Sequence, residues 1–398
     1  MPASTRIYVS GAFAFGGQPA VNDLLSGGYN TVIVWSVHVS PEGDLFLNDT
    51  LFVSGGVYKE TTPMNLPPRI AQLRKAGVEI IFSVGAGGTC DFSSINTLLG
   101  GKTGGAGNLV YENFKALKKA MTDAGGDIDA IDFDNEDRLE SGVMINFADT
   151  LKSIGYNHVT LCPYSDQPTW YDTMKQLVKN YGTSFVNAIH LQCYSGGRDN
   201  VDIVSDWVTG FKQAGGNALM IPGLATNQPD YGWYTCGLGP GVAKVPNVAM
   251  YEGADWSNFL YTQNYMNVET ALWKAPGCAT FFFYCRQPMV LKNGRSFRPG
   301  DAVYFSGIPW WGSAPQCDGY TRSGPVTDIY NPSQMGGACP SQLQAQYKKW
   351  GNKLVNGGFI WLYDSIVSGL LSSCCNGTLQ KPTATTLAYR QAITNGLS

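Results

Sequence analysis

The chain has 398 residues, of which 44% are hydrophobic and only 14% are charged, whereas an average globular protein has about 25% charged residues. The formal net charge is −3 and no run of Lys or Arg exceeds two residues, so the chain lacks the basic surface of a nucleic-acid-binding protein. It contains no stretch of 18 uncharged apolar residues, and 12% of its residues are aromatic, which argues against a membrane span and against disorder. The length allows two or three domains, or one barrel with an insertion.

Short apolar runs rich in β-branched and aromatic residues alternate along the chain with amphipathic stretches. The predicted strands are 6–15, 30–39, 78–88, 127–136, 158–165, 188–197, 218–227 and 357–366, and the predicted helices between them include 67–77, 111–126, 141–155, 169–182 and 200–216. Near-continuous apolar strands that alternate with helices indicate βαβ units and a parallel sheet. Eight such strands predict an α/β fold of the (β/α)₈ TIM-barrel type. The alternative is an open doubly wound sheet, but the segment GAFAFGG after the first strand lacks the expected GxGxxG pattern.

The regular spacing breaks once, between the seventh and eighth predicted strands. About 130 residues lie there, where a barrel usually spends about 30. This stretch holds five of the ten cysteines, namely Cys236, Cys278, Cys285, Cys317 and Cys339. We therefore expect a catalytic barrel over 1–228 and 346–398, with an inserted subdomain of loops and short strands over 229–345. The insertion leaves the C-terminal end of a strand, which is the face where barrel active sites are built.

The cysteines leave two alternatives open. They are not arranged in CxxC pairs, and the three histidines, His38, His158 and His190, are isolated, so we expect no metal site and a structural role for each histidine. The cysteines are either free thiols in an intracellular protein or disulfides in a secreted one. The low charge and the sequons at Asn48 and Asn376 favour secretion. The opening residues MPASTRIYVS lack the apolar core of a signal peptide.

The fourth predicted strand carries an unusual row of acids, with the sequence DAIDFDNE at 129–136. Strand side chains alternate with period two, so Asp132, Asp134 and Glu136 share one face, while Asp129 lies on the other and is expected to be structural. Three like charges a few ångströms apart cannot all ionise, so at least one proton is retained. Glu136, the last and longest of the three, is the natural proton donor at the barrel mouth. A polar edge strand or a calcium loop is the alternative, but a calcium loop needs Gly at its sixth position.

The acidic row resembles the DxxDxDxE signature of glycoside hydrolase family 18, which contains chitinases and endo-β-N-acetylglucosaminidases. Further landmarks of the family follow in the expected order: SVGAGG at 83–88 resembles its SxGG segment, QCY at 192–194 resembles its Met/Gln-x-Tyr segment, and Trp361 resembles its tryptophan on the eighth strand. The resemblance covers roughly 1–228 and 350–398, and it is nearest to the plant-type chitinases.

The resemblance implies a substrate-assisted reaction. Glu136 would protonate the glycosidic oxygen, and the 2-acetamido carbonyl of the substrate would attack in place of a second carboxylate. Asp134 would hold the acetamido N–H, and Asp132 would tune Asp134 by sharing a proton. Tyr194 would donate a hydrogen bond to the acetamido oxygen and so position the nucleophile.

Substrate binding is implied for further residues. Trp361 would form an apolar floor under the sugar, and Gln192 would contact the acetamido group or Glu136. Trp310 and Trp311 in the insertion are either a sugar-stacking platform or the small core of that subdomain. Within SVGAGG, Ser83 and Gly85 are expected to be structural.

Three positions depart from the family pattern: Ala86 replaces the second glycine of SxGG, Ser195 follows Tyr194 where many bacterial chitinases have Asp, and Asn135 stands where an apolar residue is frequent. These departures bear on the substrate more than on the reaction. The resemblance implies retaining hydrolysis of β-1,4 bonds at N-acetylglucosamine in chitin or chitooligosaccharides, without metal or organic cofactor. An endo-β-N-acetylglucosaminidase acting on N-glycans is the first alternative, and a barrel that only binds sugar is the second. Neither a nucleic acid nor a membrane is expected as a partner.

Overall fold

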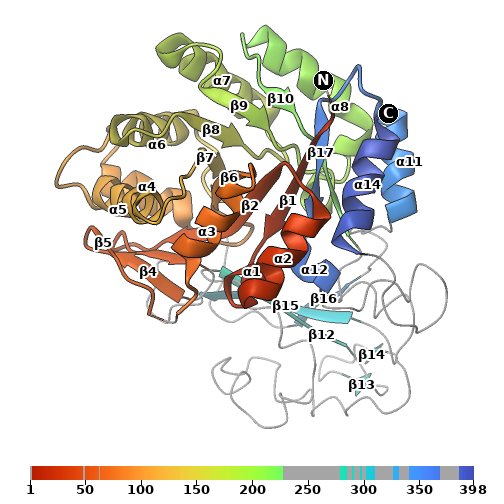
Figure 1. Ribbon diagram of the computed structural model, residues 1–398, viewed down its shortest axis with the longest axis horizontal. Helices are drawn as coiled ribbons and strands as arrows, with labels where there is room; N and C mark the ends of the chain where they lie inside the picture. The colour runs from red at the N-terminus through yellow and green to blue at the C-terminus, as the bar shows by residue number, and fades with distance from the viewer. Residues whose placement is uncertain are drawn as a thin grey trace.

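A computed structural model describes residues 2–47, 50–61, 63–226, 340–367 and 385–398, together with the backbone of five strands between 278 and 330. Its centre is a parallel sheet surrounded by helices (Figure 1). In spatial order, the sheet contains β10 (Leu219–Met220), β9 (Val186–Ile189), β8 (His158–Leu161), β7 (Ala130–Phe133), β6 (Glu79–Val84), β2 (Thr31–Val39), β1 (Ser4–Val9), β17 (Gly357–Trp361) and β11 (Gly223–Ala225).

β10 and β11, which lie at the two ends of this strand order, follow each other in the chain and together occupy one strand position of the sheet. β10 pairs with β9, and β11, which follows it in the chain, pairs with β17. Backbone N–H and C=O of Gly223 also bond to Leu191 and Cys193, which extend β9. Parallel pairing thus passes through eight strand positions, and all eight predicted strands are found. The predicted α/β barrel, with a long insertion between its seventh and eighth strands, is confirmed.

Helices cover the outside of the sheet (Figure 1). The predicted helices correspond to α3 (Leu66–Lys75), α5 (Leu109–Asp123), α6 (Ser141–Ile154), α7 (Gln167–Tyr181) and α8 (Asn200–Gln213). The sequence did not predict the others, which are α1 (Gly11–Ala14), α2 (Gly17–Gly27), α4 (Asp91–Leu99), α11 (Pro340–Trp350), α12 (Tyr363–Val367), α14 (Thr386–Gly396) and the 3₁₀ turn η1 (Ser195–Gly197). None of the helices in the described ranges is long and apolar enough to cross a membrane.

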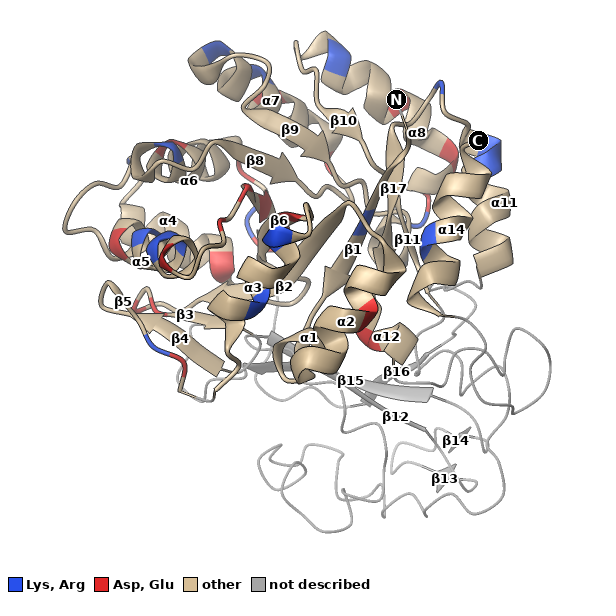
Figure 2. Ribbon diagram, in the orientation of Figure 1, with Lys and Arg blue, Asp and Glu red and all other residues tan. Residues whose placement is uncertain are grey.

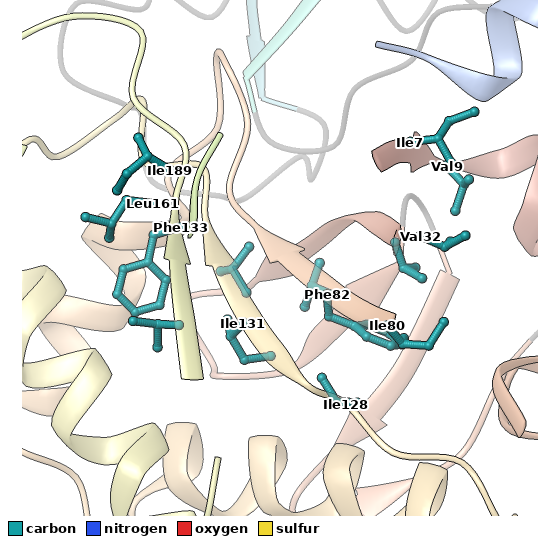
Figure 3. Close-up of a cluster of buried hydrophobic side chains, with 14 of the residues drawn as sticks. Ile7, Val9, Val32, Ile80, Phe82, Ile128, Ile131, Phe133, Leu161 and Ile189 are labelled. Atoms are coloured by element: carbon teal, nitrogen blue, oxygen red, sulfur yellow. The ribbon is translucent and has the colours of Figure 1, made fainter. Parts of the chain in front are cut away.

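The alternation of side chains along each strand produces two separate cores. On β7, Ile131 and Phe133 pack outward between the sheet and the helices, with Phe82 of β6 and Leu161 of β8 beside them (Figure 3). The inward-facing positions form a second cluster inside the barrel, whose members include Tyr8, Ile33, Ile81, Ala130, Ala188, Ile221 and Phe359. Because Asp132 shares the parity of Ala130, the acidic row enters the barrel, as its spacing predicts.

Two additions extend beyond the barrel. After β2, the chain forms an antiparallel extension of β3 (Leu45–Leu47), β4 (Thr50–Ser54) and β5 (Val57–Tyr58), which was not predicted. In the insertion, β12 (Cys278–Tyr284), β15 (Ala302–Pro309) and β16 (Val326–Tyr330) form one antiparallel sheet, and β13 (Met289–Val290) pairs with β14 (Ser296–Phe297). The proposed domain boundaries remain a prediction, and Trp310 and Trp311 lie outside the described residues.

Candidate active site

The register of the parallel strands surrounds Asp132 with hydroxyl groups. Asp132 of β7 lies level with Ser83 of β6 on one side and with Thr160 of β8 on the other. The Ser83 hydroxyl donates to Oδ2 at 2.8 Å, and the Thr160 hydroxyl donates to Oδ1 at 2.5 Å. Ser83, for which we expected a structural role only, therefore contacts the acidic row directly.

Two further donors reach Asp132 from distant strands. The Tyr8 hydroxyl of β1 donates to Oδ2 at 2.8 Å, and Nδ1 of His190, just beyond β9, lies 2.8 Å from Oδ1. Asp132 is fully buried. Burial opposes its ionisation, but His190 and the hydroxyl donors outweigh burial and lower the pKa of Asp132. The first carboxyl group of the row is therefore an anion.

The pKa of Asp134 is shifted in the opposite direction. Its Oδ2 accepts a hydrogen bond from the indole N–H of Trp35 at 2.9 Å, and its Oδ1 accepts one from the Gln192 amide at 2.9 Å. Burial, followed by the charges of Glu136 and Asp132, raises the pKa of Asp134 well above its ordinary value. This is the result expected for like charges in a buried row.

Glu136 lies at the end of the row, on the segment that leaves β7. Acidic residues gather there (Figure 2). The Gln192 amide that bonds Asp134 also donates to Glu136 Oε1 at 3.0 Å, so one amide group joins the two carboxyl groups. Burial raises the pKa of Glu136, while hydrogen bonds from Gln192 and Asp134 oppose the shift. The pair of Asp134 and Glu136 thus retains a proton toward neutral pH, which is what a general acid requires.

Glycines of the 83–88 segment let the acidic row approach this closely. Gly85 has φ +99°, and a Cβ added there would lie 2.2 Å from the Asp134 carbonyl oxygen. A Cβ on Gly87 would lie 2.9 Å from Oε2 of Glu136. At Gly85 only glycine adopts this conformation and leaves this space without strain, whereas a side chain at Gly87 would displace the Glu136 carboxyl group.

Aromatic side chains pack beside the carboxyl groups. The Trp361 ring stacks on Tyr194 with ring centroids 5.5 Å apart at 18°, and it meets Trp35 edge-on at 4.6 Å. Burial raises the pKa of the Tyr194 hydroxyl well above its ordinary value, so this group remains a hydrogen-bond donor at any physiological pH. The residues expected from the sequence, Glu136, Asp134, Asp132, Tyr194, Gln192 and Trp361, are thus brought together, whereas Trp310 and Trp311 lie outside the described residues.

The sequence reasoning missed several members of the site. Tyr8, Trp35 and Thr160 contact the acidic row, and His190, expected to be isolated, bonds Asp132. Strand parity offered a signal, because His190 is two residues before Gln192 on the same face. By contrast, Asp129 on the opposite face pairs with Arg74 at 2.9 Å, in agreement with its expected structural role.

The departure at Asn135 has a local explanation. Its side-chain amide donates to the Arg138 carbonyl at 2.6 Å, and its side-chain oxygen accepts from the Arg138 N–H at 3.1 Å. Asn135 therefore closes the turn that carries Glu136. Among the described side chains, no group of three or more His, Cys, Asp or Glu is arranged to hold a metal ion.

Comparisons with known proteins find similarity in structure but not in sequence. No family model and no curated protein matches the chain. A solved chitinase structure from Rhizomucor miehei is 12% identical, with a TM-score of 0.47 over 98% of this chain and 99% of that one. A chitinase from Chromobacterium violaceum is 10% identical, with a TM-score of 0.44 over 99% of this chain and 98% of that one. A chitinase from Aspergillus fumigatus is 17% identical, with a TM-score of 0.40 over 56% of this chain and 78% of that one.

Proposed function

We propose that this protein is a retaining glycoside hydrolase that cleaves β-1,4 bonds at N-acetylglucosamine, with chitin or chitooligosaccharide as its substrate. The observation that carries the proposal is the acidic row that begins with Asp132 on β7 and continues past the end of that strand. It places an ionised Asp132 beneath a buried pair, Asp134 and Glu136, that retains a proton. The stacked rings of Tyr194 and Trp361 lie beside this pair.

The proposed first step is cleavage of the glycosidic bond. Glu136 donates its proton to the glycosidic oxygen, and the bond between this oxygen and the anomeric carbon of the N-acetylglucosamine unit breaks. The acetamido carbonyl oxygen of that unit bonds to the anomeric carbon, so that a cyclic oxazolinium intermediate forms. Asp134 accepts the acetamido N–H, and Tyr194 donates to the acetamido oxygen. Trp361 supplies an apolar face for the sugar ring, because flat aromatic side chains bury sugar C–H surfaces at little entropic cost. Water then opens the intermediate, with Glu136 as the base.

The decisive experiment compares wild type with Glu136→Gln on a chitooligosaccharide and, separately, on a high-mannose glycopeptide, with products identified by mass. We expect wild type to cleave the chitooligosaccharide, and the variant to lose about 10²–10⁴-fold in turnover while it still binds sugar. Cleavage of the glycopeptide alone would identify an endo-β-N-acetylglucosaminidase. Binding without cleavage of either substrate by wild type would identify a sugar-binding barrel.

The mechanism has its own test. A thiazoline analogue of N-acetylglucosamine mimics the cyclic intermediate, so it should inhibit the enzyme. Fully deacetylated chitosan lacks the acetamido nucleophile and should not be cleaved. Efficient turnover of chitosan would show that another group attacks the sugar.

We further propose that the protein is secreted. The low charge and the two sequons favour this location. The inserted subdomain would extend the substrate cleft, with Trp310 and Trp311 as sugar-binding residues.

A further inference from the structure

A chain of buried polar side chains lies behind Asp132, on the side away from the proposed sugar site. Nη1 of Arg6, on β1, lies 3.0 Å from Nε2 of His190, and Nδ1 of His190 lies 2.8 Å from Asp132. At the far end, Arg6 Nη2 is 3.6 Å from the carboxylate of Glu79 on β6. The side chains of Arg6 and His190 are 3% and 0% exposed. Four strand positions thus contribute to one line of contacts.

The chemistry of arginine fixes the direction of these hydrogen bonds. A guanidinium group donates hydrogen bonds and accepts none, so His190 Nε2 must accept from Arg6. The proton of the neutral imidazole therefore lies on Nδ1, and Nδ1–H donates to Asp132. A second proton has no place on Nε2, whose lone pair is already occupied. The pKa of His190 is lowered accordingly, with burial as the largest cause and Arg6 acting in the same direction against Asp132.

With the His190 N–H as a donor, the carboxylate of Asp132 accepts as many hydrogen bonds as its oxygens allow. Oδ1 accepts from Thr160 and His190, and Oδ2 accepts from Tyr8 and Ser83. An ionised carboxylate has about four lone-pair sites, and all of them are used. Protonation of Asp132 would therefore require one of the three hydroxyl groups to reverse and accept the new proton, or would leave a donor unsatisfied in a fully buried position.

We propose that Arg6 and His190 are positioning residues that hold Asp132 as a permanent anion, so that the proton retained in the acidic row belongs to Asp134 and Glu136 alone. The inference rests on the proposed function and revises the expectation that Asp132 shares a proton with Asp134. The fixed charge of Asp132 repels a second charge on the neighbouring pair, so Glu136 remains protonated to higher pH and serves as the acid there.

Titratable groups on several strands, or just beyond them, act on Asp132 or His190. The titratable and charged groups that act on Asp132 or His190 are Tyr8 and Arg6 of β1, Glu79 of β6, Asp134 after β7, Cys162 after β8, and His190 and Tyr194 after β9. Of these, only Arg6 carries a fixed positive charge, and it reaches Asp132 through His190.

Two substitutions at His190 distinguish the effect of its N–H donor from the effect of its side-chain volume. In His190→Leu, Asp132 loses an N–H donor and can take up a proton. Its charge then weakens, the pKa of the Asp134–Glu136 pair falls, and the alkaline limb of the kcat/KM profile moves to lower pH by about 0.5 unit or more. We expect kcat to fall more than KM rises. His190→Asn offers an amide N–H to Asp132 and an oxygen to Arg6, so its alkaline limb should stay at the wild-type pH. If the alkaline limbs of folded His190→Leu and His190→Asn lie at the same pH, the proposal is overturned.

Nuclear magnetic resonance tests the same proposal without activity. In wild type, the imidazole nitrogens of His190, assigned by their loss in His190→Asn, should show a proton on Nδ1 only and no titration between about pH 5 and 9. The carboxyl carbon of Asp132 should keep the shift of an anion over that range. In Arg6→Met, Nε2 is released and His190 should titrate. A wild-type His190 that titrates, or that carries its proton on Nε2, would contradict the proposal. A wild type that cleaves no sugar but shows the expected nitrogen signals would refute only the proposed function.

Discussion

Single hydrogen-bond donors determine how charge is divided among the three carboxyl groups of the site. Asp132 accepts four hydrogen bonds and ionises, whereas Asp134 accepts from Trp35 and Gln192 beside two other carboxyl groups and tends to stay protonated. Trp35 donates its N–H to Asp134 and, unlike Gln192, does not bind Glu136. A substitution at Trp35 therefore perturbs Asp134 without removing a hydrogen bond from Glu136.

The substitution Trp35→Phe removes this N–H and keeps an aromatic ring against Trp361. The net contribution of a hydrogen bond is about 0.5–1.5 kcal/mol, so we expect kcat to fall by about 2- to 10-fold, with a smaller change in KM. Steady-state kinetics on a chitooligosaccharide would measure it. Trp350→Phe is the matched control, since it removes an indole hydrogen bond to the Val201 carbonyl outside the site and should leave kcat unchanged. Similar losses in both variants would assign the effect to general destabilisation.

At the scale of elements, the start of α4 is joined to the segment that follows β7. The carboxylate of Asp137, one residue beyond Glu136, accepts hydrogen bonds from the backbone N–H groups of Phe92 and Ser93 at 3.2 and 2.9 Å. These groups belong to the first turn of α4, where N–H groups lack helical partners. Burial, together with the nearby charge of Asp91, raises the pKa of Asp137 to about 6. This contact therefore fixes the segment that carries the proposed acid, and it depends on pH.

Asp137 should make the stability of the protein fall between about pH 4 and pH 6. Its folded pKa lies above its ordinary value, so the folded state binds more protons in this range, and its stabilising contribution is complete at low pH and lost as the pH rises through 6. A shift of this size corresponds to about 3 kcal/mol. Asp137→Asn cannot titrate, so its free energy of unfolding should fall less between pH 4 and 7. Urea denaturation at several pH values would measure this, and parallel curves for the two proteins would contradict it.

At the scale of the whole molecule, the seventh and eighth strand positions pair with each other on either side of the long insertion. Gly223 pairs with Phe359 of β17 and also bonds to the extension of β9. A Cβ at Gly223 would lie 1.9 Å from the Phe359 ring, which belongs to the core inside the barrel. Tyr347 of α11 donates its hydroxyl hydrogen to the carbonyls of Pro222 and Phe359 from outside. This junction is packed tightly on both faces.

Gly223→Ala should therefore destabilise the whole protein. An added methyl group in a well-packed core typically costs about 1–3 kcal/mol, because Phe359 has to leave its position. Chemical denaturation would measure the loss in the free energy of unfolding. Gly105→Ala is the control, since no atom lies within 4 Å of its added Cβ, and it should change stability by no more than about 0.5 kcal/mol. Equal effects at both positions would show that this junction tolerates added volume.

The sequence by itself determined the local features of this protein. Apolar runs and helical spacing located the eight strands and five of the helices, and period two along the predicted strand 127–136 placed Asp132, Asp134 and Glu136 on one face. It did not predict α4 or the antiparallel extension after β2, which are short and take part of their stability from packing against the barrel. Only the tertiary structure decided which groups surround the acidic row. Tyr8, Trp35 and His190 come from three other strand positions, and Asp132 and Tyr8 are separated by 124 residues in the chain. The physical reason is that the charge of a buried carboxyl group depends on the donors within a few ångströms of it, and in a barrel those donors are selected by the register between strands that are distant in sequence.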